Sequence, residues 1–323
     1  MSILEVRNLK THFFTPFGLV KAVDGVSFDM KRGKALGLAG ESGCGKTTIA
    51  YSIMRLIPNP GRIVEGNILF NGKDLAKLND KELQAVRWKE ISMVFQGAMA
   101  SFNPLFTIGD QISEAILNHE KVSKAEAMNR TYELLELVGI DRERAKNYPW
   151  ELSGGMKQRS MIAMALSCNP TLLIADEPTT ALDVIVSAQI MDLIKSLREK
   201  LDLTMLLITH DISVIAQTCD ELAVMYGGKL VEKTDVSKIF TDSIHPYTTA
   251  LINAFPSIMG PNQELFGIPG NPLDLMNPPL GCRFAPRCPK AQPICIAEDP
   301  VLNEIESDHF VACHFWKEIY DER

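Results

Sequence analysis

The sequence lacks several features that would assign it to particular classes of protein. No window of 18 residues is uniformly apolar, so we expect no segment that spans a bilayer. The N-terminus, residues 1–7, has no basic region followed by an apolar one, so we expect no signal peptide and a chain that stays in the cytoplasm. Long runs of Lys or Arg are also missing and the net charge is −7, which argues against a nucleic-acid partner.

The composition of the chain is typical of a globular protein. The 323 residues are 46% hydrophobic and 23% charged, which is enough for one large domain or two medium ones. The seven cysteines are unevenly distributed, because four of them fall between residues 282 and 313. Structural disulfides are rare in the cytoplasm, so we do not expect these cysteines to form them.

One glycine-rich stretch, residues 40–48, predicts a nucleotide site. It reads GESGCGKTT and matches the pattern G-x-x-x-x-G-K-[ST] of phosphate-binding loops. The apolar run 35–39 predicts a strand before it and residues 48–55 predict a helix after it, which disfavours a chance match. Backbone N–H groups and the helix dipole can bind phosphate oxygens in such a loop. Lys46 can reach the β- and γ-phosphates, and the Thr47 hydroxyl can bind Mg²⁺.

The order of the predicted elements indicates an α/β core with a helical insertion. Residues 1–34 and 61–95 have the patterns of β-strands. Residues 107–166 have helical periodicity instead, which predicts an insertion between two parts of the core. The apolar runs 171–176 and 205–208 flank a predicted helix, an arrangement typical of a parallel sheet that is covered on both faces.

Two further stretches have residue types that suit phosphate chemistry. Asp176 and Glu177 end a predicted strand, where one acid can hold Mg²⁺ and the next can polarise an attacking water. A solvated strand end is the alternative. In residues 152–159, Ser153 is a good N-cap before two glycines, so that backbone N–H groups are exposed at a helix start. This is a second anion-binding terminus, although an ordinary capped helix is the alternative.

Together these motifs resemble those of the ATP-binding cassette (ABC) ATPases across residues 1–255. The motifs follow one another in the order found in that family: residues 40–48, Gln96, 152–159, Asp176 and Glu177, 181–183, and His210. The resemblance implies an α/β fold, with an ABC-type phosphate-loop ATPase core, an antiparallel β-subdomain and a helical subdomain at about residues 97–166.

The resemblance also implies a role for each matching residue. The implied ATP-binding residues are Phe17, on the adenine ring, and Gly40, Ser42, Gly43, Cys44, Gly45, Lys46, Thr47 and Thr48. The implied Mg²⁺ ligands and sensors are Thr47, Gln96 and Asp176. The residues implied in hydrolysis are Glu177 as general base, His210 on the γ-phosphate, and Gln96, which also links the site to a membrane partner. The residues implied to act across a dimer are Asp183 and, on the γ-phosphate held by the other subunit, Ser153, Gly154 and Gly155.

A narrower resemblance, to the ATPase subunits of dipeptide/oligopeptide importers, covers nearly all of the chain. It is carried by residues 179–184, 245–251 and 281–289. It implies that ATP binding closes a head-to-tail cassette dimer, that hydrolysis resets it, and that this cycle drives peptide uptake. Gly97 and Trp150 depart from the family pattern, where an acid and often a His are found, so coupling to the membrane subunit could be altered there.

The same resemblance implies several partners. We expect a second, similar cassette in a heterodimer, two membrane-spanning permease subunits and an extracytoplasmic solute-binding protein. The chain itself is then peripheral on the cytoplasmic side of the cell membrane. Oligosaccharides, nickel and glutathione are alternative cargoes, and a soluble ABC ATPase of DNA repair or translation is a less favoured alternative.

The C-terminal residues 256–323 predict an extension that follows the cassette. Residues 256–281 contain six prolines and predict an irregular linker. The four clustered cysteines follow it: Cys282, Cys288, Cys295 and Cys313. Four thiolates suit zinc or an iron–sulfur cluster, and the spacing alone leaves zinc, iron–sulfur and free thiols equally open.

The resemblance to the importer branch favours one of these alternatives. Members of that branch carry a [4Fe–4S] cluster at this arrangement of cysteines, so an iron–sulfur cluster is implied, with Zn²⁺ as the alternative. We expect it to be structural, because a tail so rich in proline is not expected to fold around a core of its own. His309 and His314 flank the last cysteine and are alternative ligands, although we expect them to be surface residues.

Overall fold

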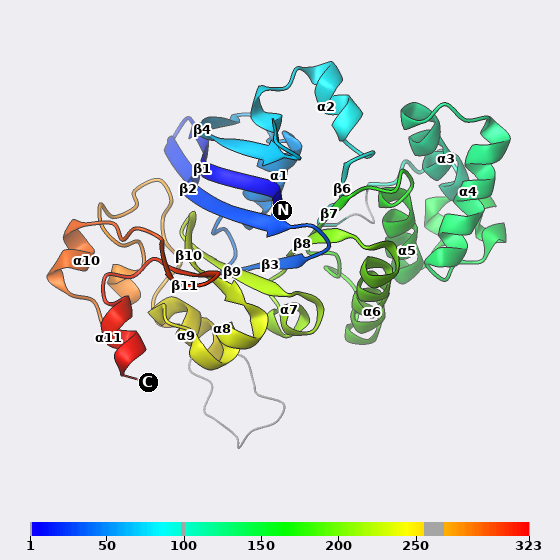
Figure 1. The fold of residues 1–323 in the computed structure, drawn as a ribbon. Coiled ribbons are helices and arrows are strands. Elements are labelled where there is room, and N and C mark those ends of the chain that lie inside the picture. The colour runs from blue at the N-terminus through cyan, green and yellow to red at the C-terminus, as the bar shows by residue number, and fades with distance from the viewer. Residues whose placement is uncertain (1, 98–100, 255–267, 323) are drawn as a thin grey trace. The chain divides into compact units, whose positions relative to one another are not determined.

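The structure is a computed structural model that describes residues 2–97, 101–254 and 268–322. It comprises two compact units (Figure 1). Unit 1 contains residues 1–31, 35–76 and 208–323, and unit 2 contains residues 32–34 and 77–207. Much of the predicted linker, residues 255–267, lies outside the described residues. None of the described helices is both long enough and apolar enough to cross a membrane.

Unit 1 begins with a four-stranded antiparallel sheet. β1 (Ser2–Thr15) pairs with β2 (Gly18–Lys31) on one side and with β4 (Gly61–Phe70) on the other. β5 (Lys73–Asp74) completes the order β2-β1-β4-β5. Asn71 and Gly72 connect β4 to β5 with positive φ angles of 47° and 78°, as the Asn-Gly turn signal predicts.

A second set of strands in unit 1 leads into the phosphate loop. β3 (Ala35–Ala39) pairs in parallel with β9 (Glu221–Tyr226), and every residue of both strands is buried. β9 pairs antiparallel with β10 (Lys229–Asp235), as expected after a short turn. The same unit contains the helices α1 (Lys46–Met54), α7 (Ile212–Thr218), α8 (Val236–Asp242) and α9 (Pro246–Asn253). The last three contact β3, β9 or β10 (Figure 1).

The C-terminal extension packs within unit 1. Its strand β12 (His309–Val311) pairs with β10, and β11 (Asn303–Glu306) pairs with β12. Val311 and Ile319 form a buried apolar cluster with Ile244. Ile244 lies outside the extension, so the extension is held by apolar contacts with the rest of unit 1 as well as by strand pairing. Its remaining elements are η5 (Ala285–Arg287), α10 (Pro293–Ala297) and α11 (Trp316–Asp321).

Unit 2 combines parallel strands with the predicted helices. β6 (Ile91–Val94) pairs in parallel with β7 (Leu172–Asp176), and β8 (Thr204–Ile208) is the next strand in order. The predicted helices are confirmed, since residues 107–166 contain α3 (Ile108–His119), α4 (Lys124–Leu137) and α5 (Gly154–Ala165). Ser123 and Glu126 form a capping box at the start of α4. Helix α6 (Val184–Leu201) connects β7 to β8.

The β-rich interpretation of residues 61–95 is wrong in one segment. Residues 75–77 form the short helix η1 (Leu75–Lys77), and residues 80–86 form α2 (Asp80–Val86). Asn79 accepts a hydrogen bond from the N–H of Glu82, whose side chain accepts from the N–H of Asn79. This capping box is visible in the sequence as N-x-x-E and explains why the helix begins there.

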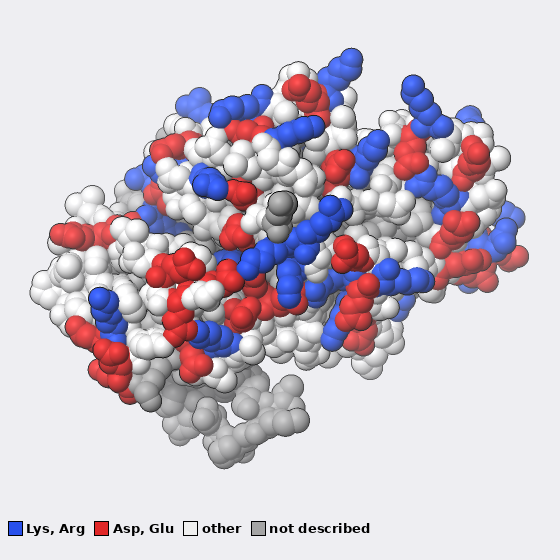
Figure 2. Space-filling model, viewed as in Figure 1, with Lys and Arg blue, Asp and Glu red and all other residues white. Residues whose placement is uncertain are grey.

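Charged side chains of both signs are interspersed on the face shown in Figure 2. Surface ion pairs within unit 1 include Lys31 with Asp308 (2.8 Å) and Lys10 with Glu65 (2.6 Å). Exposed pairs of this kind contribute little to stability, at most about 1 kcal/mol each. They do, however, neutralise much of the charge locally.

Candidate functional site: phosphate loop, catalytic carboxylate and cysteine cavity

The phosphate loop lies between β3 and α1, and its conformation depends on glycine. Gly40, Gly43 and Gly45 have φ angles of 148°, 78° and 106°, which L side chains rarely adopt. A Cβ on Gly40 would lie 2.2 Å from the carbonyl oxygen of Met225, and one on Gly45 would lie 2.1 Å from that of Ala22. The loop is therefore packed so closely against its neighbours that only glycine fits at these two positions.

Lys46 is held inside this loop. Its side chain is buried, and Nζ donates hydrogen bonds to the carbonyl oxygens of Gly40 (2.8 Å) and Glu41 (3.0 Å). Helix α1 begins at Lys46 without a side-chain cap. An uncapped helix start with a lysine inside the loop is an arrangement that suits anionic phosphate oxygens.

Two other residues expected near the nucleotide lie in unit 1 and reach its surface. Phe17 occupies the two-residue turn between β1 and β2 and is 91% exposed. His210 is also exposed and lies between Thr209, which follows β8, and Asp211, which caps α7. An aromatic side chain that is so exposed at the tip of a hairpin is available for stacking on a ligand.

The register of β6 with β7 brings Gln96 and Glu177 together in unit 2. Val94 pairs with Ala175, so the residues two positions further along lie opposite each other. Gln96 Nε2 donates to Glu177 Oε2 at 2.8 Å, and Thr180 Oγ1 donates to the same oxygen at 2.9 Å. These two donors orient the carboxylate at the end of β7.

The backbone at this strand end is also unusual. Glu177 has a φ of 44°, a left-handed conformation that is uncommon for residues other than glycine. Such conformations persist where the surrounding structure enforces them, and they cluster at functional sites. The preceding residue, Asp176, is fully buried at the last position of β7.

Residues 152–159, here called the signature, include the start of helix α5, which Ser153 caps. Ser153 Oγ accepts a hydrogen bond from the Met156 N–H at 3.3 Å, so the N-cap prediction is confirmed. A Cβ on Gly155 would lie 2.8 Å from Cγ1 of Val186, which shows how closely α5 approaches α6. Asp183 caps α6 by accepting from the Val186 N–H at 2.9 Å. The signature glycines and Asp183 thus belong to one local arrangement.

The expected site residues are divided between the two units. Unit 1 contains the phosphate loop, Phe17 and His210. Unit 2 contains Gln96, Ser153, Gly154, Gly155, Asp176, Glu177 and Asp183. Of these, the structure joins Gln96 to Glu177 by a hydrogen bond.

The structure adds contacts of the phosphate loop that sequence motifs did not reveal. Arg287 of the extension donates to both carboxylate oxygens of Glu41, at 2.8 and 2.9 Å. This carboxylate raises the pKa of the Arg287 guanidinium above its usual range. The N–H of Glu41 donates to the hydroxyl oxygen of Tyr247 at 2.9 Å. Tyr247 and Arg287 both lie in stretches that carry the resemblance to peptide importers, but the motifs gave them no role.

Aromatic side chains connect these contacts. The rings of Tyr226, Tyr247 and Phe284 lie 4.7 to 5.3 Å apart between centroids. The tilted and edge-on orientations are those that aromatic pairs prefer. This cluster joins the end of β9 and the start of α9 to the cysteine-containing segment.

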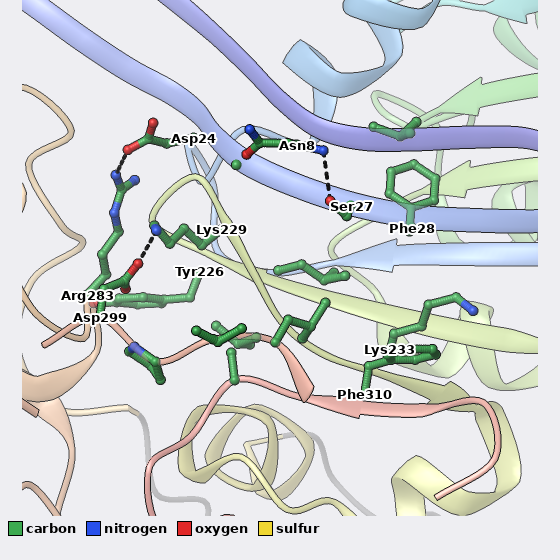
Figure 3. A pocket seen from close by; sticks show the side chains of 18 of the residues that line it. Asn8, Asp24, Ser27, Phe28, Tyr226, Lys229, Lys233, Arg283, Asp299 and Phe310 are labelled. Atoms are coloured by element: carbon green, nitrogen blue, oxygen red, sulfur yellow. Dashed lines mark hydrogen bonds and ion pairs between the residues drawn. The ribbon is translucent and has the colours of Figure 1, made fainter. Parts of the chain in front are cut away.

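A cavity of about 870 Å³ lies in unit 1, lined by β1, β2, β10 and the extension (Figure 3). Arg283 pairs with Asp24 on one wall, and Lys229 pairs with Asp299 close by. Burial raises the pKa of Asp24, but Arg283 and His12 outweigh it and lower the pKa overall. Because these charges already have partners, the cavity does not by itself identify a ligand.

The four clustered cysteines all line a second, much smaller cavity. Burial raises the pKa of Cys282 and of Cys313 to about 11. All seven cysteines of the chain are free, as expected. Within the part of the chain that the structure describes, no group of three or more His, Cys, Asp or Glu residues has an arrangement that could hold a metal ion.

The expectation that His309 is a surface residue is wrong. Its side chain is fully buried, and its Nε2 is 2.9 Å from Oε1 of Glu232, which is also buried. The same carboxylate accepts hydrogen bonds from the N–H groups of Ile244 and His245. A buried carboxylate requires such partners, and the sequence spacing around Cys313 gave no sign of them. His314 lies 2.9 Å from the carbonyl oxygen of Glu298.

Comparisons with known proteins decide the family. The model described as "ABC transporter" matches residues 23–180, and the model described as "Oligopeptide/dipeptide transporter, C-terminal region" matches residues 231–295. The chain is 48% identical over 313 residues to the oligopeptide transport ATP-binding protein OppD of Bacillus subtilis (strain 168), covering 96% of this chain and 87% of that protein. The chain belongs to the ABC transporter family.

A second relative and a solved structure narrow the type of ABC protein and test its fold. It is 41% identical over 318 residues to the dipeptide transport ATP-binding protein DppD of Caldanaerobacter subterraneus subsp. tengcongensis, covering 98% of each chain. The solved dimeric structure of MJ0796, a bacterial ABC transporter cassette, has a TM-score of 0.65 and 29% identity over 72% of this chain and 98% of that one. The predicted cassette fold is thus confirmed, and the chain is an ATPase subunit of the oligopeptide/dipeptide transporter type.

Proposed function

We propose that this ABC subunit hydrolyses ATP with Glu177 as the general base and that hydrolysis drives uptake of di- or oligopeptides. One observation carries the catalytic part: Gln96 and Thr180 both donate to one oxygen of the Glu177 carboxylate. A general base must be positioned before it can take a proton from water, and a second group usually orients it. Gln96 also senses Mg²⁺ and the attacking water and transmits the state of the site to the membrane partner.

The proposed nucleotide contacts are those that the resemblance to ABC ATPases implies. The phosphates bind the loop of residues 40–48, with Lys46 on the β- and γ-phosphates, while Phe17 stacks on adenine. Thr47, Gln96 and Asp176 offer hydroxyl, amide and carboxylate oxygens, the hard ligands that suit Mg²⁺. Bound Mg²⁺ neutralises charge on the phosphates, and His210 contacts the γ-phosphate.

The chain acts in a head-to-tail dimer with a second, similar cassette in this proposal. The Ser153-capped start of α5 and the Asp183-capped start of α6 lie in one local arrangement, which suits a shared contact with a partner. Each cassette then supplies its signature to the ATP held by the other. MJ0796, whose fold is similar, was solved as a dimer. Two permease subunits and an extracytoplasmic solute-binding protein complete the transporter, and the chain is peripheral on the cytoplasmic side.

The four-cysteine cavity holds a [4Fe–4S] cluster in this proposal, with Zn²⁺ as the alternative. The donor set supports it, because four thiols line one cavity and thiolates bind either metal centre. With pKa values of about 11, Cys282 and Cys313 are protonated at neutral pH, so metal binding would release protons. The side chains must also reorient on binding, since the described residues form no ready metal site. The proposed role of the cluster is structural.

Transport by the reconstituted complex tests the proposal. The chain, its partner cassette, the permeases and the solute-binding protein are placed in lipid vesicles with labelled peptide, oligosaccharide, Ni²⁺ or glutathione. We expect peptide uptake that requires hydrolysable ATP. Uptake of another cargo instead overturns the peptide assignment. A rate of ATP hydrolysis that is the same with and without the membrane subunits favours a soluble ABC ATPase.

A further inference from the structure

Glu41, the second residue of the phosphate loop, is fixed through each of its polar groups. Its N–H donates to the hydroxyl of Tyr247 at 2.9 Å. Its carbonyl oxygen accepts from Lys46 Nζ at 3.0 Å and from the Cys44 N–H at 3.2 Å. Its carboxylate accepts two parallel hydrogen bonds from Arg287. The loop is therefore held at this residue by contacts from the C-terminal part of the chain.

Arg287 is itself fixed by the extension. Its side chain is only 7% exposed. Besides Glu41, its guanidinium donates to the carbonyl oxygen of Pro269 at 2.7 Å and to that of Ile268 at 3.2 Å, and it reaches the hydroxyl of Tyr226 at 3.3 Å. A guanidinium with this many fixed acceptors has little freedom to turn away from Glu41.

A carboxylate inside an anion-binding loop has a cost that Arg287 removes. Nucleotide phosphates carry several negative charges, and an unpaired Glu41 carboxylate in the same loop would repel them. The bidentate pair neutralises this carboxylate and turns it toward the extension. It also fixes the loop before the ligand arrives, so that less conformational freedom is lost on binding.

We propose that Arg287 is a positioning residue of the ATP site, which acts by holding and neutralising Glu41. The extension is then a component of the nucleotide site as well as the bearer of the cysteines. This inference rests on the proposed binding of ATP phosphates by residues 40–48. It does not depend on whether the cysteine cavity holds a metal.

A set of variants tests whether Arg287 acts through Glu41. Arg287→Met keeps the bulk of the side chain but leaves the carboxylate unpaired, and we expect the Kd for Mg-ATP to rise about tenfold. Glu41→Gln removes the charge and should change the Kd by about threefold or less. The double variant should bind as Glu41→Gln does, because no carboxylate remains for Arg287 to neutralise. A role of Arg287 in folding alone would not be rescued in this way.

The control breaks a different contact of the extension. Asp299 pairs with Lys229 at the start of β10 and has no contact with Glu41 in the structure. Asp299→Asn should therefore leave the Kd for Mg-ATP unchanged. All variants are made in the full-length chain, and thermal unfolding checks that each one is folded.

Binding is measured by isothermal titration with Mg-ATP, and turnover is measured in the assembled transporter. We expect Arg287→Met to raise KM for ATP with kcat within about twofold of wild type, the pattern of lost uniform binding. Unchanged ATP affinity in Arg287→Met overturns the inference, as does weaker affinity that Glu41→Gln fails to rescue. If Arg287→Met does not fold, Arg287→Lys replaces it: a Kd about threefold higher supports the inference and an unchanged Kd overturns it. Failure of the wild-type chain to bind ATP would instead overturn the proposed function.

Discussion

The side chain of Gln96 donates a hydrogen bond to the carboxylate of Glu177 at 2.8 Å, and strand register accounts for this contact. Val94 and Ala175 are paired in adjacent parallel strands, and Gln96 and Glu177 each lie two positions further along the chain. The carboxyl ends of parallel strands meet at one edge of a sheet, so strand pairing alone brings polar residues there close together.

Replacing Glu177 by Gln should separate binding from hydrolysis. The amide can still accept a hydrogen bond from Thr180, so the local geometry is kept, but it cannot take a proton from water. We expect turnover in the assembled transporter to fall by about 100-fold or more. The Kd for Mg-ATP should stay within about twofold of wild type. Phosphate release and equilibrium ATP binding check these outcomes, and unchanged turnover would refute the general-base assignment.

Thr180 should matter for hydrolysis through its hydroxyl group alone. Thr180→Val keeps the shape of the side chain but removes the 2.9 Å donor to Glu177, which then has one orienting contact fewer. We expect kcat to fall about fivefold, equal to roughly 1 kcal/mol, without a change in the Kd for ATP. Thr180→Ser retains the hydroxyl and should restore most of kcat. Equal turnover in the Val and Ser variants would contradict this orienting role.

Local sequence patterns predicted the parts of the site that local geometry determines. The spacing of residues 40–48 predicted a strand, a glycine loop and a helix, and the structure has β3 and α1 on either side of that loop. Ser153 was expected to cap a helix and does cap α5. In each case, the residues that specify the feature lie within a few positions of one another.

The contacts that escaped prediction join residues far apart in the chain. Arg287 holds Glu41, which is 246 residues away, and His309 is paired with Glu232, which is 77 residues away. No periodicity or spacing encodes such a pair, since only the folded sheet and the packed extension bring the partners together. Helix α2 differs from these long-range contacts, because its N-x-x-E capping signal is local and is present in the sequence itself.

Phe17 should contribute to ATP affinity, whereas its neighbour Phe14 should not. Phe17 is 91% exposed at the tip of a hairpin, while the ring of Phe14 is covered by the guanidinium of Arg62 at 4.1 Å. Loss of one stacking contact by Phe17→Ala should raise the Kd for Mg-ATP about tenfold. Phe17→Tyr should retain most of the affinity. If Phe14→Ala weakens binding as much as Phe17→Ala, the assignment of the adenine contact is wrong.

Ser153 and Ser123 offer a matched pair for testing the signature. Both serines cap a helix in unit 2, α5 and α4 respectively, so replacing either by Ala should cost about 1 kcal/mol of stability. Only Ser153 is proposed to contact the ATP held by a partner cassette. Ser153→Ala should therefore lower turnover of the assembled transporter at least about tenfold while the isolated subunit binds ATP normally. Similar turnover in the two variants would show that Ser153 is an ordinary helix cap.

Metal removal should loosen the extension without unfolding unit 1. The tail is also held by pairing of β12 with β10 and by the apolar cluster of Val311, Ile319 and Ile244, so the proposed metal centre would supply only part of its stability. Anaerobically purified protein should absorb light at about 400 nm and contain iron. Cys288→Ser should lose both the absorbance and the iron, and it should lower the melting temperature by about 5 °C. Cys219 lies outside the cysteine cavity, so Cys219→Ser should lose neither signal. Stoichiometric zinc without iron would replace the iron–sulfur assignment, and a Cys288→Ser variant that loses all tertiary structure would show that the apolar contacts cannot hold the tail alone.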